Sequence, residues 1–246
     1  MGKDKLRRFA ENLTFECFVQ PAFEEAFRRD HPLKGHWHSD FFHNDNPIVL
    51  ELGCGKGEYT VALAERNPSR NFIGIDISED ILGVARRNIE AEFGEEPVEN
   101  VNLLSYNIEK LDTLFAPDEK AARIYVNFCN PWQKAGDHKR RLTHTRQLNT
   151  YKKVLAPGGE LWFKTDNTDL YLATQRYLAE AGFEILCKTD DLHSEDAPGN
   201  IQSEHEVMFT AEGIKTKAII ARWNGEPETP ERVSTEQAEK VENTAE

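Results

Sequence analysis

The stretch from residue 48 to residue 57 constrains the fold more than any other part of the sequence. It reads IVLELGCGKG, a short apolar run followed at once by three glycines at alternate positions. A compact apolar run closed by a glycine-rich turn is typical of a buried strand that leads into a helix. The residues that follow, 59–68, carry apolar side chains at helical spacing and end at a proline. This part of the chain therefore predicts a strand–turn–helix unit.

The alternation of strand and helix continues along the chain to residue 223. Further strands are predicted at 71–78, 101–107, 123–129, 160–166, 183–191 and 218–223, and further helices at 79–93, 144–156 and 168–182. Strands that alternate with helices form βαβ units, which place helices on both faces of a parallel sheet. The predicted fold class is α/β, with a mostly parallel, Rossmann-like sheet.

The length and composition favour one folded domain with segments on either side of it. The chain has 246 residues, of which 39% are hydrophobic. We expect residues 47–224 to form the domain. Residues 1–46 have no clear pattern, and we expect a segment that is partly helical or mobile and is able to lie over the active site. Residues 225–246 are rich in glutamate and poor in large apolar residues, which predicts a disordered acidic tail.

The remaining composition narrows the class of protein. A net charge of −13 argues against a general nucleic-acid binder, although the tail carries part of that charge. The chain has no apolar run near the roughly 18 residues of a membrane span and no signal-peptide pattern at its start. The four cysteines are widely spaced, and Asp190, Asp191 and His193 offer too few ligands for a metal. We expect a cytoplasmic protein with neither a membrane segment nor a metal, and the oligomeric state, monomer or homodimer, stays open.

The glycine-rich turn and two acidic residues indicate the kind of ligand. Gly53, Gly55 and Gly57 allow a tight turn and close approach of a ligand to the main chain, and Asp76 follows at the end of the next strand. An acid at that place accepts ribose hydroxyls. Glu51 stands two residues before the first glycine, where a carboxylate disfavours a pyrophosphate and suits a cationic group. The pattern favours S-adenosylmethionine over a dinucleotide, for which the spacing GxGxxG is typical; a glycine turn without a ligand is the remaining alternative.

Two asparagines follow the third and fourth of these strands. Asn107 is placed to meet an adenine amino group, although an asparagine at a strand end is more often a turn former. Asn130 opens the sequence Asn-Pro-Trp at the end of strand 123–129, and ligands in such sheets bind beyond the carboxyl ends of the strands. Trp132 either stacks on a base or packs beneath the loop. We place Asn130 at the methyl-transfer position.

A basic run comes next, at 138–141, with Lys134 before it and Arg146 after it. Such a run is usually the solvated face of a helix. Beside a cofactor site, however, it is also suited to phosphates, and Lys139, Arg140 and Arg141 are our candidates for contacts with a nucleic-acid backbone.

Taken together, these motifs resemble the bacterial tRNA (guanine-N7-)-methyltransferases from about residue 47 to residue 223. The matching stretches are ELGCGKGEY, FIGIDIS, NFCNPWQKAGDHKRRLTH, FKTDN, DLH and NIQSEHEVMF. The resemblance implies a class I S-adenosylmethionine-dependent methyltransferase fold and methyl transfer to N7 of a variable-loop guanine, position 46, in tRNA. It implies cofactor contacts from Glu51, Asp76, Asn107 and Asn130, with Asn130 at the catalytic position. It further implies substrate contacts from Lys134, Asp166, Ser203, Glu204, His205 and Glu206.

The chain departs from the family at several of these positions. The family commonly has Asp where this chain has Asn107 and Asn130, Pro where it has Gln133, and Tyr where it has His205. Guanine N7 carries a lone pair and no proton, so its attack on a methyl group needs no general base. We therefore expect Asn130 to orient the base or the cofactor, and Asp166 and Glu206 to read the guanine edge or offset the positive charge of the product.

Three alternatives stay open on sequence grounds. Asn-Pro-Trp is similar to the Asn-Pro-Pro-Tyr loop of enzymes that methylate exocyclic amino groups, so an RNA amino-group methyltransferase is one. A catalytically weak relative that only binds RNA is the second. A nicotinamide-dependent oxidoreductase is the third, and the glycine spacing and Glu51 disfavour it.

Overall fold

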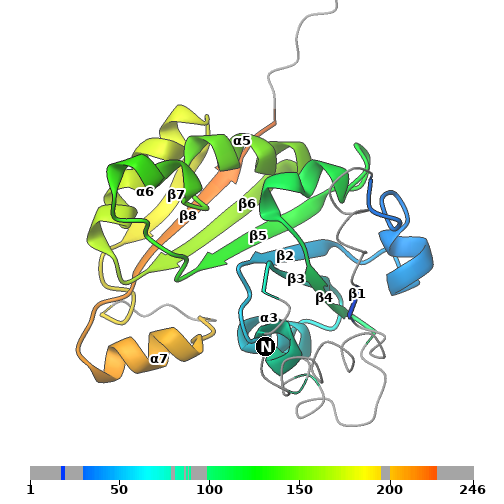
Figure 1. The fold of residues 1–246 in the computed structure, drawn as a ribbon, viewed down its shortest axis with the longest axis horizontal. Helices are drawn as coiled ribbons and strands as arrows, with labels where there is room; N and C mark the ends of the chain where they lie inside the picture. Colours follow the sequence, from blue (N-terminus) through cyan, green and yellow to red (C-terminus); the bar gives the residue numbers. More distant parts are fainter. Residues whose placement is uncertain are drawn as a thin grey trace, which may run out of the picture.

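One mixed sheet forms the centre of the molecule (Figure 1). The computed structural model describes residues 18–19, 30–78, 81–85, 87, 89, 99–194 and 200–225. Within them the strands are β1 (Phe18–Val19), β2 (Ile48–Leu52), β3 (Asn71–Asp76), β4 (Val101–Ser105), β5 (Ala121–Asn127), β6 (Leu155–Thr165), β7 (Glu184–Thr189) and β8 (Lys217–Trp223). The α-helices are α3 (Glu58–Arg66), α5 (Thr145–Val154), α6 (Thr168–Glu180) and α7 (Glu204–Ala211), and the shorter turns are η1 (Trp37–Phe42), η2 (Ile108–Thr113) and η3 (Ala135–Arg140).

The strand order is β1-β4-β3-β2-β5-β6-β8-β7, and the order along the chain reverses between β2 and β5. Strands β1 to β6 pair in parallel, whereas β8 runs antiparallel to both β6 and β7. This arrangement confirms the predicted α/β fold with a mostly parallel sheet. The junction of β2 and β5 is the switch point at which such sheets bind ligands.

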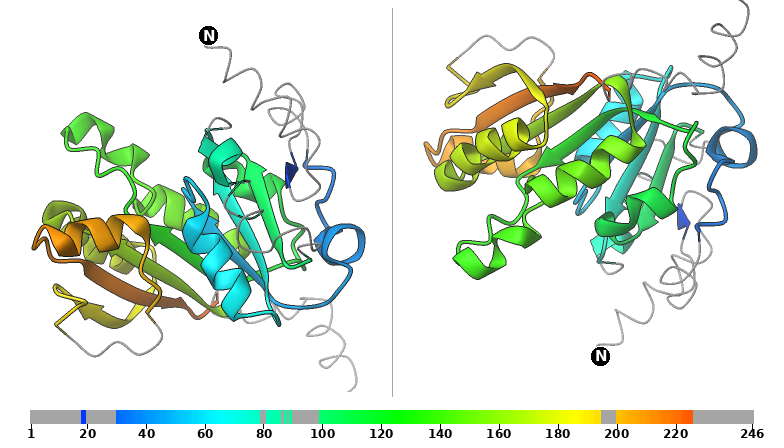
Figure 2. Two further views of the ribbon diagram at one scale, coloured as in Figure 1. Left: turned by 90° about the horizontal axis from the view of Figure 1, so that it is seen from below. Right: turned by 90° about the horizontal axis from the view of Figure 1, so that it is seen from above.

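The central strands are apolar throughout because both faces of the sheet are covered. Along β2, Ile48, Leu50 and Leu52 face one core, which includes residues of α5 and α6, while Val49 faces a second core with residues of α3. In Figure 1, α5 and α6 lie above the sheet and α3 and α7 below it, and the views from below and above in Figure 2 show the same two layers. Residues 81–85, 87 and 89, within the predicted helix 79–93, are helical.

The described residues 30–46 of the N-terminal segment pack against η2 and the turn that precedes β5. Trp37 is fully buried, and its indole N–H donates to the carbonyl of Leu114 at 3.0 Å. The backbone N–H groups of Gly35 and Trp37 each donate to the carboxylate of Glu119 at 2.9 Å. These contacts hold residues 30–46 beside the turn that precedes β5. That the segment lies over the active site stays a prediction, and its earlier part lies outside the described residues, apart from 18–19.

Two element boundaries differ from the sequence prediction. Helix α5 ends at Val154, and β6 already begins at Leu155 because this residue pairs with Ala121 across an irregular register. The Pro-Gly-Gly sequence at 157–159, which suggested a loop, therefore lies within the strand, where Gly158 adopts a φ of +80°.

Helix α7 was not predicted, although Ser203 followed by Glu206 is the signature of a capping box. The predicted acidic tail lies almost wholly outside the described residues.

None of the helices in the described ranges combines the length and the apolarity that crossing a membrane requires.

Candidate active site

The glycine-rich turn after β2 is fixed by the acid at the end of β3. Gly53, Gly55 and Gly57 adopt φ values of +78°, +52° and +70°, a region that disfavours side chains. The carboxylate of Asp76 accepts the backbone N–H of Gly55 at 3.1 Å and that of Ser78 at 2.9 Å. Carboxylate oxygens have further lone pairs, so Asp76 still has acceptor capacity toward a ligand.

The second and third glycines of the turn serve different purposes. A Cβ on Gly57, which precedes α3, would lie 2.9 Å from the Cβ of Ala85, so this glycine allows close packing of two helical segments. A Cβ on Gly55 would meet nothing within 4 Å. The space beside Gly55 is therefore open, as a ligand site requires. Gly57 has a packing role, and its contact with a cofactor stays a prediction.

Glu51 is a buried carboxyl group at the floor of the site. Its side chain accepts hydrogen bonds from the Thr60 hydroxyl and, at 3.2 Å, from the Asn127 amide. Burial raises the pKa of Glu51 to about 7, against an ordinary value of 4.5. A carboxyl group with this pKa changes its charge near neutral pH. A cationic partner would stabilise its charged form, which burial disfavours.

Two adjoining cavities lie at the carboxyl ends of the strands. The first, called here the Glu51 cavity, measures about 450 Å³. The second, the Asp76 cavity, measures about 540 Å³, and the two share Gly53 and Phe128. Among the predicted site residues, the Glu51 cavity is lined by Glu51, Gly53, Gly55, Ser203, Glu204 and His205, and the Asp76 cavity by Gly53, Asp76, Asn107, Asn130 and Arg140. The Asp76 cavity is also lined by Glu109 and Gln147, so the glycine turn lies between an acidic, partly aromatic cavity and one with two carboxylates and three amides.

The loop after β5 carries Asn130 into the Asp76 cavity. The side-chain oxygen of Asn130 accepts the backbone N–H of Trp132 at 2.9 Å, which leaves the amide N–H groups for a ligand. Phe128 and Trp132 both have left-handed backbone, with φ values of +49° and +43°. Such conformations cost about 1–3 kcal/mol each and persist where surrounding contacts impose them, which is typical of functional sites.

Asn107 serves two purposes at once. Its side-chain oxygen accepts the backbone N–H of Glu109 at 3.0 Å and so caps η2. It also lines the Asp76 cavity. The turn-former reading and the ligand-contact reading of this residue are therefore compatible.

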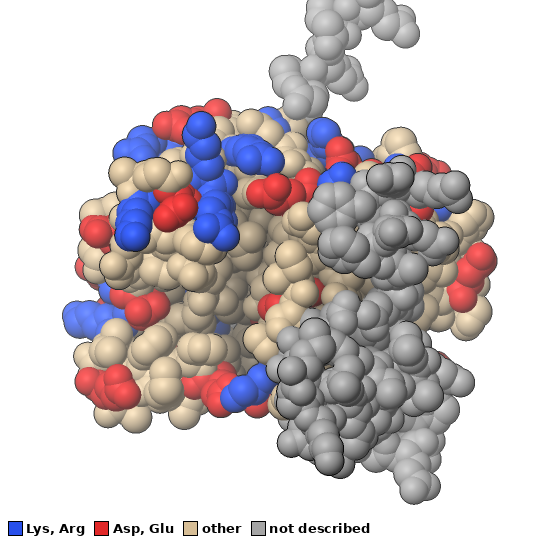
Figure 3. All heavy atoms as spheres, viewed as in Figure 1, with Lys and Arg blue, Asp and Glu red and all other residues tan. Residues whose placement is uncertain are grey.

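The basic run does not form one solvated face. Lys and Arg side chains gather around α5, α6 and the turn η3 (Figure 3). The Arg140 guanidinium lies 3.6 Å above the Trp132 ring and 3.7 Å from the Asp137 carboxylate. Lys134 and Lys139 are exposed, with no side-chain hydrogen bond or ion pair to any described residue. Arg141 is only 3% exposed, and its guanidinium contacts the carbonyls of Pro131 and Trp132, so the prediction that it meets a nucleic-acid backbone does not fit its position.

Helix α7 brings the Ser-Glu-His sequence to the Glu51 cavity. Ser203 caps the helix, accepting the backbone N–H of Glu206 at 3.2 Å. Glu204 forms an ion pair with Lys56 of the glycine turn at 2.6 Å. The ring of His205 stacks on Phe128 with 5.9 Å between centroids. Lys56, Asn127 and Phe128, which sequence reasoning missed as site residues, line this cavity too; the signal available for the last two was their place at the end of β5.

Glu206 and Asp166 lie outside both cavities. Glu206 is fully buried, and its carboxylate meets the Lys164 ammonium at 2.8 Å, the Asn200 amide at 2.7 Å and the His193 ring at 3.3 Å. This group anchors α7 to β6, so the structure does not support contact of Glu206 with a substrate. Asp166 lines neither cavity, and it follows β6 directly before Asn167, whose side chain caps α6 by accepting the Leu170 N–H at 2.8 Å.

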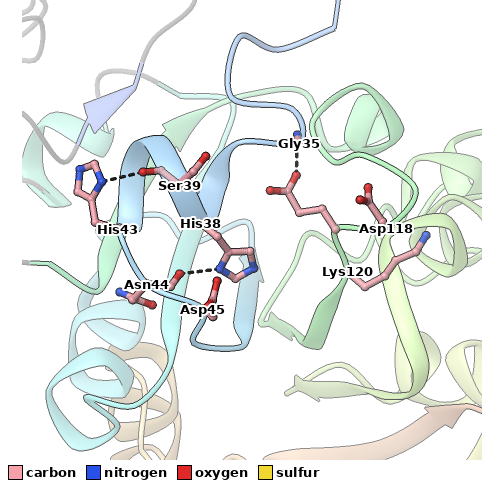
Figure 4. A pocket seen from close by; sticks show the side chains of 9 residues that line it. Gly35, His38, Ser39, His43, Asn44, Asp45, Asp118 and Lys120 are labelled. Atoms are coloured by element: carbon pink, nitrogen blue, oxygen red, sulfur yellow. Dashed lines mark hydrogen bonds between the residues drawn. The ribbon is translucent and has the colours of Figure 1, made fainter.

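A third cavity, of about 660 Å³, is built by the N-terminal segment and the turn before β5 (Figure 4). The rings of His38 and His43 are tied by Nδ1 to the backbone carbonyls of Asn44 and Ser39, at 2.9 and 2.7 Å. This cavity shares no lining residue with the other two. Over the described ranges, no three His, Cys, Asp or Glu side chains are arranged to hold a metal ion.

The raised pKa of Glu51 predicts a pH-dependent stability. Between pH 4.5 and 7 the folded state holds a proton that the unfolded state has released, so the free energy of unfolding decreases as pH rises through this window. The full effect is up to about 3 kcal/mol. In urea unfolding of the ligand-free protein, we expect Glu51→Gln to match the wild type at pH 5 and to be the more stable at pH 8. A difference between the two proteins that does not change with pH would contradict this.

Comparisons with known proteins identify the family of the chain. Residues 45–219 match the model of a family described as "Putative methyltransferase". The tRNA (guanine-N(7)-)-methyltransferase of Clostridium beijerinckii is 48% identical over 190 residues, covering 76% of this chain and 86% of that protein. The proteins of the same name from Clostridium perfringens strain 13 and Acetivibrio thermocellus are 45% and 44% identical over 191 residues, with 77% and 76% of this chain and 87% of each relative covered.

Solved structures support the fold. The 16S rRNA methyltransferase KamB aligns with a TM-score of 0.54 at 13% identity, over 77% of this chain and 91% of that one. An antibiotic-related methyltransferase aligns with a TM-score of 0.52 at 16% identity, over 74% and 89%. The sheet is therefore that of a class I methyltransferase, and on the sequence matches the chain belongs to the tRNA (guanine-N7-)-methyltransferase family.

Proposed function

We propose that this protein transfers the methyl group of S-adenosylmethionine to N7 of guanine 46 in the variable loop of tRNA. The observation that carries the proposal is the pair of adjoining cavities at the β2–β5 switch point, with Glu51 in one and Asp76 and Asn130 in the other. Family membership supports both the reaction and the substrate. A tRNA substrate also supports a cytoplasmic location.

The residues around the glycine turn fit S-adenosylmethionine. This cofactor has an ammonium group, a sulfonium and a ribose with two hydroxyls. The buried carboxyl of Glu51 suits a cation, and Asp76 suits the hydroxyls. The open space beside Gly55 admits a ligand against the main chain. Ile77, which is 72% exposed at the Asp76 cavity, offers an apolar surface for an adenine ring. Gly53, Asn107 and Asn130 complete the proposed cofactor contacts.

The reaction requires the protein mainly to orient the guanine base relative to the cofactor. When bound, S-adenosylmethionine supplies the electrophilic methyl group. Guanine N7 attacks with its own lone pair, so no residue has to remove a proton, and holding the base in line provides the main acceleration. Asn130 lines the Asp76 cavity, where its amide N–H groups are available to a ligand, and His205 on Phe128 offers a ring surface in the adjoining Glu51 cavity. Ser203, Glu204 and Lys134 are the further substrate contacts that we propose.

Product analysis tests the function directly. Unmodified tRNA is incubated with the protein and isotopically labelled S-adenosylmethionine, digested to nucleosides and analysed by mass spectrometry. We expect label in N7-methylguanosine, and only in tRNA that has a guanine at position 46. Label in an N-methylated amino group would instead support the amino-group methyltransferase, and an absence of label, with the cofactor bound, would support the RNA-binding relative.

Substitutions at Asn130 separate orientation from charge. Aspartate keeps the side-chain oxygen that accepts the Trp132 N–H but loses the amide donors, so we expect Asn130→Asp to lower kcat by no more than about tenfold. Alanine removes both the turn and the donors, and we expect Asn130→Ala to lower kcat by about 10- to 100-fold. A rise of orders of magnitude in Asn130→Asp would show that charge stabilisation, and not orientation, limits this enzyme.

The exposed lysines beside the loop predict the salt dependence of tRNA binding. Lys134 and Lys139 are exposed, have side chains free of partners among the described residues, and follow Asn130 by four and nine residues in the chain. We expect Lys139→Ala to weaken tRNA binding and to reduce the slope of log K against log salt by about 1. Arg66→Ala, at an exposed position at the end of α3, serves as the control and should change neither. An unchanged slope in Lys139→Ala would mean that this lysine belongs to a solvated face.

A further inference from the structure

Arg141 differs from every other cation of the basic run. It is 3% exposed, whereas the side chain of its neighbour Arg140 is 59% exposed. No carboxylate of a described residue lies within ion-pair distance of it. Its Nε donates to the carbonyl of Pro131 at 2.7 Å, and a terminal nitrogen lies 3.4 Å from the carbonyl of Trp132. Arg141 is thus a buried guanidinium that contacts the backbone carbonyls of a single loop. These contacts indicate that it supports the structure of that loop.

The loop that Arg141 contacts needs external support. Phe128 and Trp132 hold left-handed backbone without being glycine. The Asn130 side chain accepts the Trp132 N–H from one side, while Arg141 binds the Pro131 and Trp132 carbonyls from the other. The peptide between Pro131 and Trp132 is thereby fixed from both sides. Free of these contacts, Trp132 would relax toward ordinary backbone and release the side-chain oxygen of Asn130.

The base from which Arg141 extends is itself rigid. The carbonyl of Leu142 accepts the hydroxyl of Tyr151 in α5 at 2.8 Å. The hydroxyl of Thr143 lies 2.7 Å from that of Thr174 in α6, and both residues are fully buried. The two helices therefore hold the backbone that follows Arg141 in place. The hydrogen bonds of Arg141 then fix the 130–132 loop relative to these helices.

We propose that Arg141 is a positioning residue: it locks the 130–132 turn so that the Asn130 amide faces the reacting base, and it does not contact tRNA. The proposal rests on the proposed function in assigning Asn130 to that base. Arginine suits this role because its planar group spans two carbonyls, whereas lysine reaches one.

The experiment uses ¹⁹F NMR of the full chain labelled with 5-fluorotryptophan. The chain has four tryptophans, and Trp132→Phe identifies the Trp132 signal. In Arg141→Met we expect the Trp132 signal to shift or broaden while those of Trp37, Trp162 and Trp223 stay in place. Arg66→Met, the same change at an exposed arginine, should leave all four unchanged.

Kinetics give the second readout. We expect Arg141→Met to lower kcat at least about tenfold while KM for tRNA stays within about threefold, and Arg141→Lys to lie between it and the wild type. A raised KM with unchanged kcat, or an unmoved Trp132 signal, would overturn the proposal in favour of a tRNA contact. If Arg141→Met does not fold, Arg141→Lys decides by the same criteria. If the wild type does not methylate tRNA, the proposed function fails, while the Trp132 signal still tests the lock.

Discussion

Parallel pairing of β2 with β5 brings together two turns that are far apart in the chain; Glu51 and Asn127, just before them, are 76 residues apart. Glu51 pairs in register with Tyr125, so the glycine turn after β2 and the Asn-Pro-Trp loop after β5 leave the sheet side by side. Because the strand order reverses here, no crossover helix fills the space above them. The two cavities, their shared lining by Gly53 and Phe128, and the hydrogen bond from Asn127 to Glu51 all follow from this pairing.

The charged side chains of the site differ widely in burial. Glu51 and the pair of Lys164 and Glu206 are buried. The pair attaches α7 to β6, whereas Glu51 is the carboxyl group that we propose for the cationic group of the cofactor. Lys134 and Lys139 lie outside, where a phosphate backbone is accessible. An acidic protein is thus compatible with a nucleic-acid substrate, because attraction depends on the local distribution of charge and not on the total. Arg141 is adjacent in sequence to the exposed basic residues, but it is buried like Glu51, Lys164 and Glu206.

Much of the fold was predictable because it depends on local patterns. Apolar runs of strand length, amphipathic helices and their terminating residues indicated every central strand and the helices α3, α5 and α6. The positions of Glu51, Asp76, Asn107 and Asn130 were also predictable, since all four lie at or just beyond the carboxyl ends of strands, and these ends meet at one edge of the sheet. The start of β6 was not, because its Pro-Gly-Gly sequence resembles a loop and its pairing with Ala121 is a non-local contact. Helix α7 is short, and it is held by the buried Lys164–Glu206 pair rather than by an apolar stripe.

The sequence by itself determined the α/β class, the strand-end positions of the acidic and amide side chains, and the resemblance that names the reaction. Only the tertiary structure decided which polar groups face the cavities and which hold the framework. Glu206 and Arg141 carry the same kinds of charge as Glu204 and Arg140, yet they point inward and bind Lys164 and the loop carbonyls. The physical reason is that burial of a charged group depends on partners distant in the sequence, here Lys164 at 42 residues from Glu206, and adjacent positions give no sign of them.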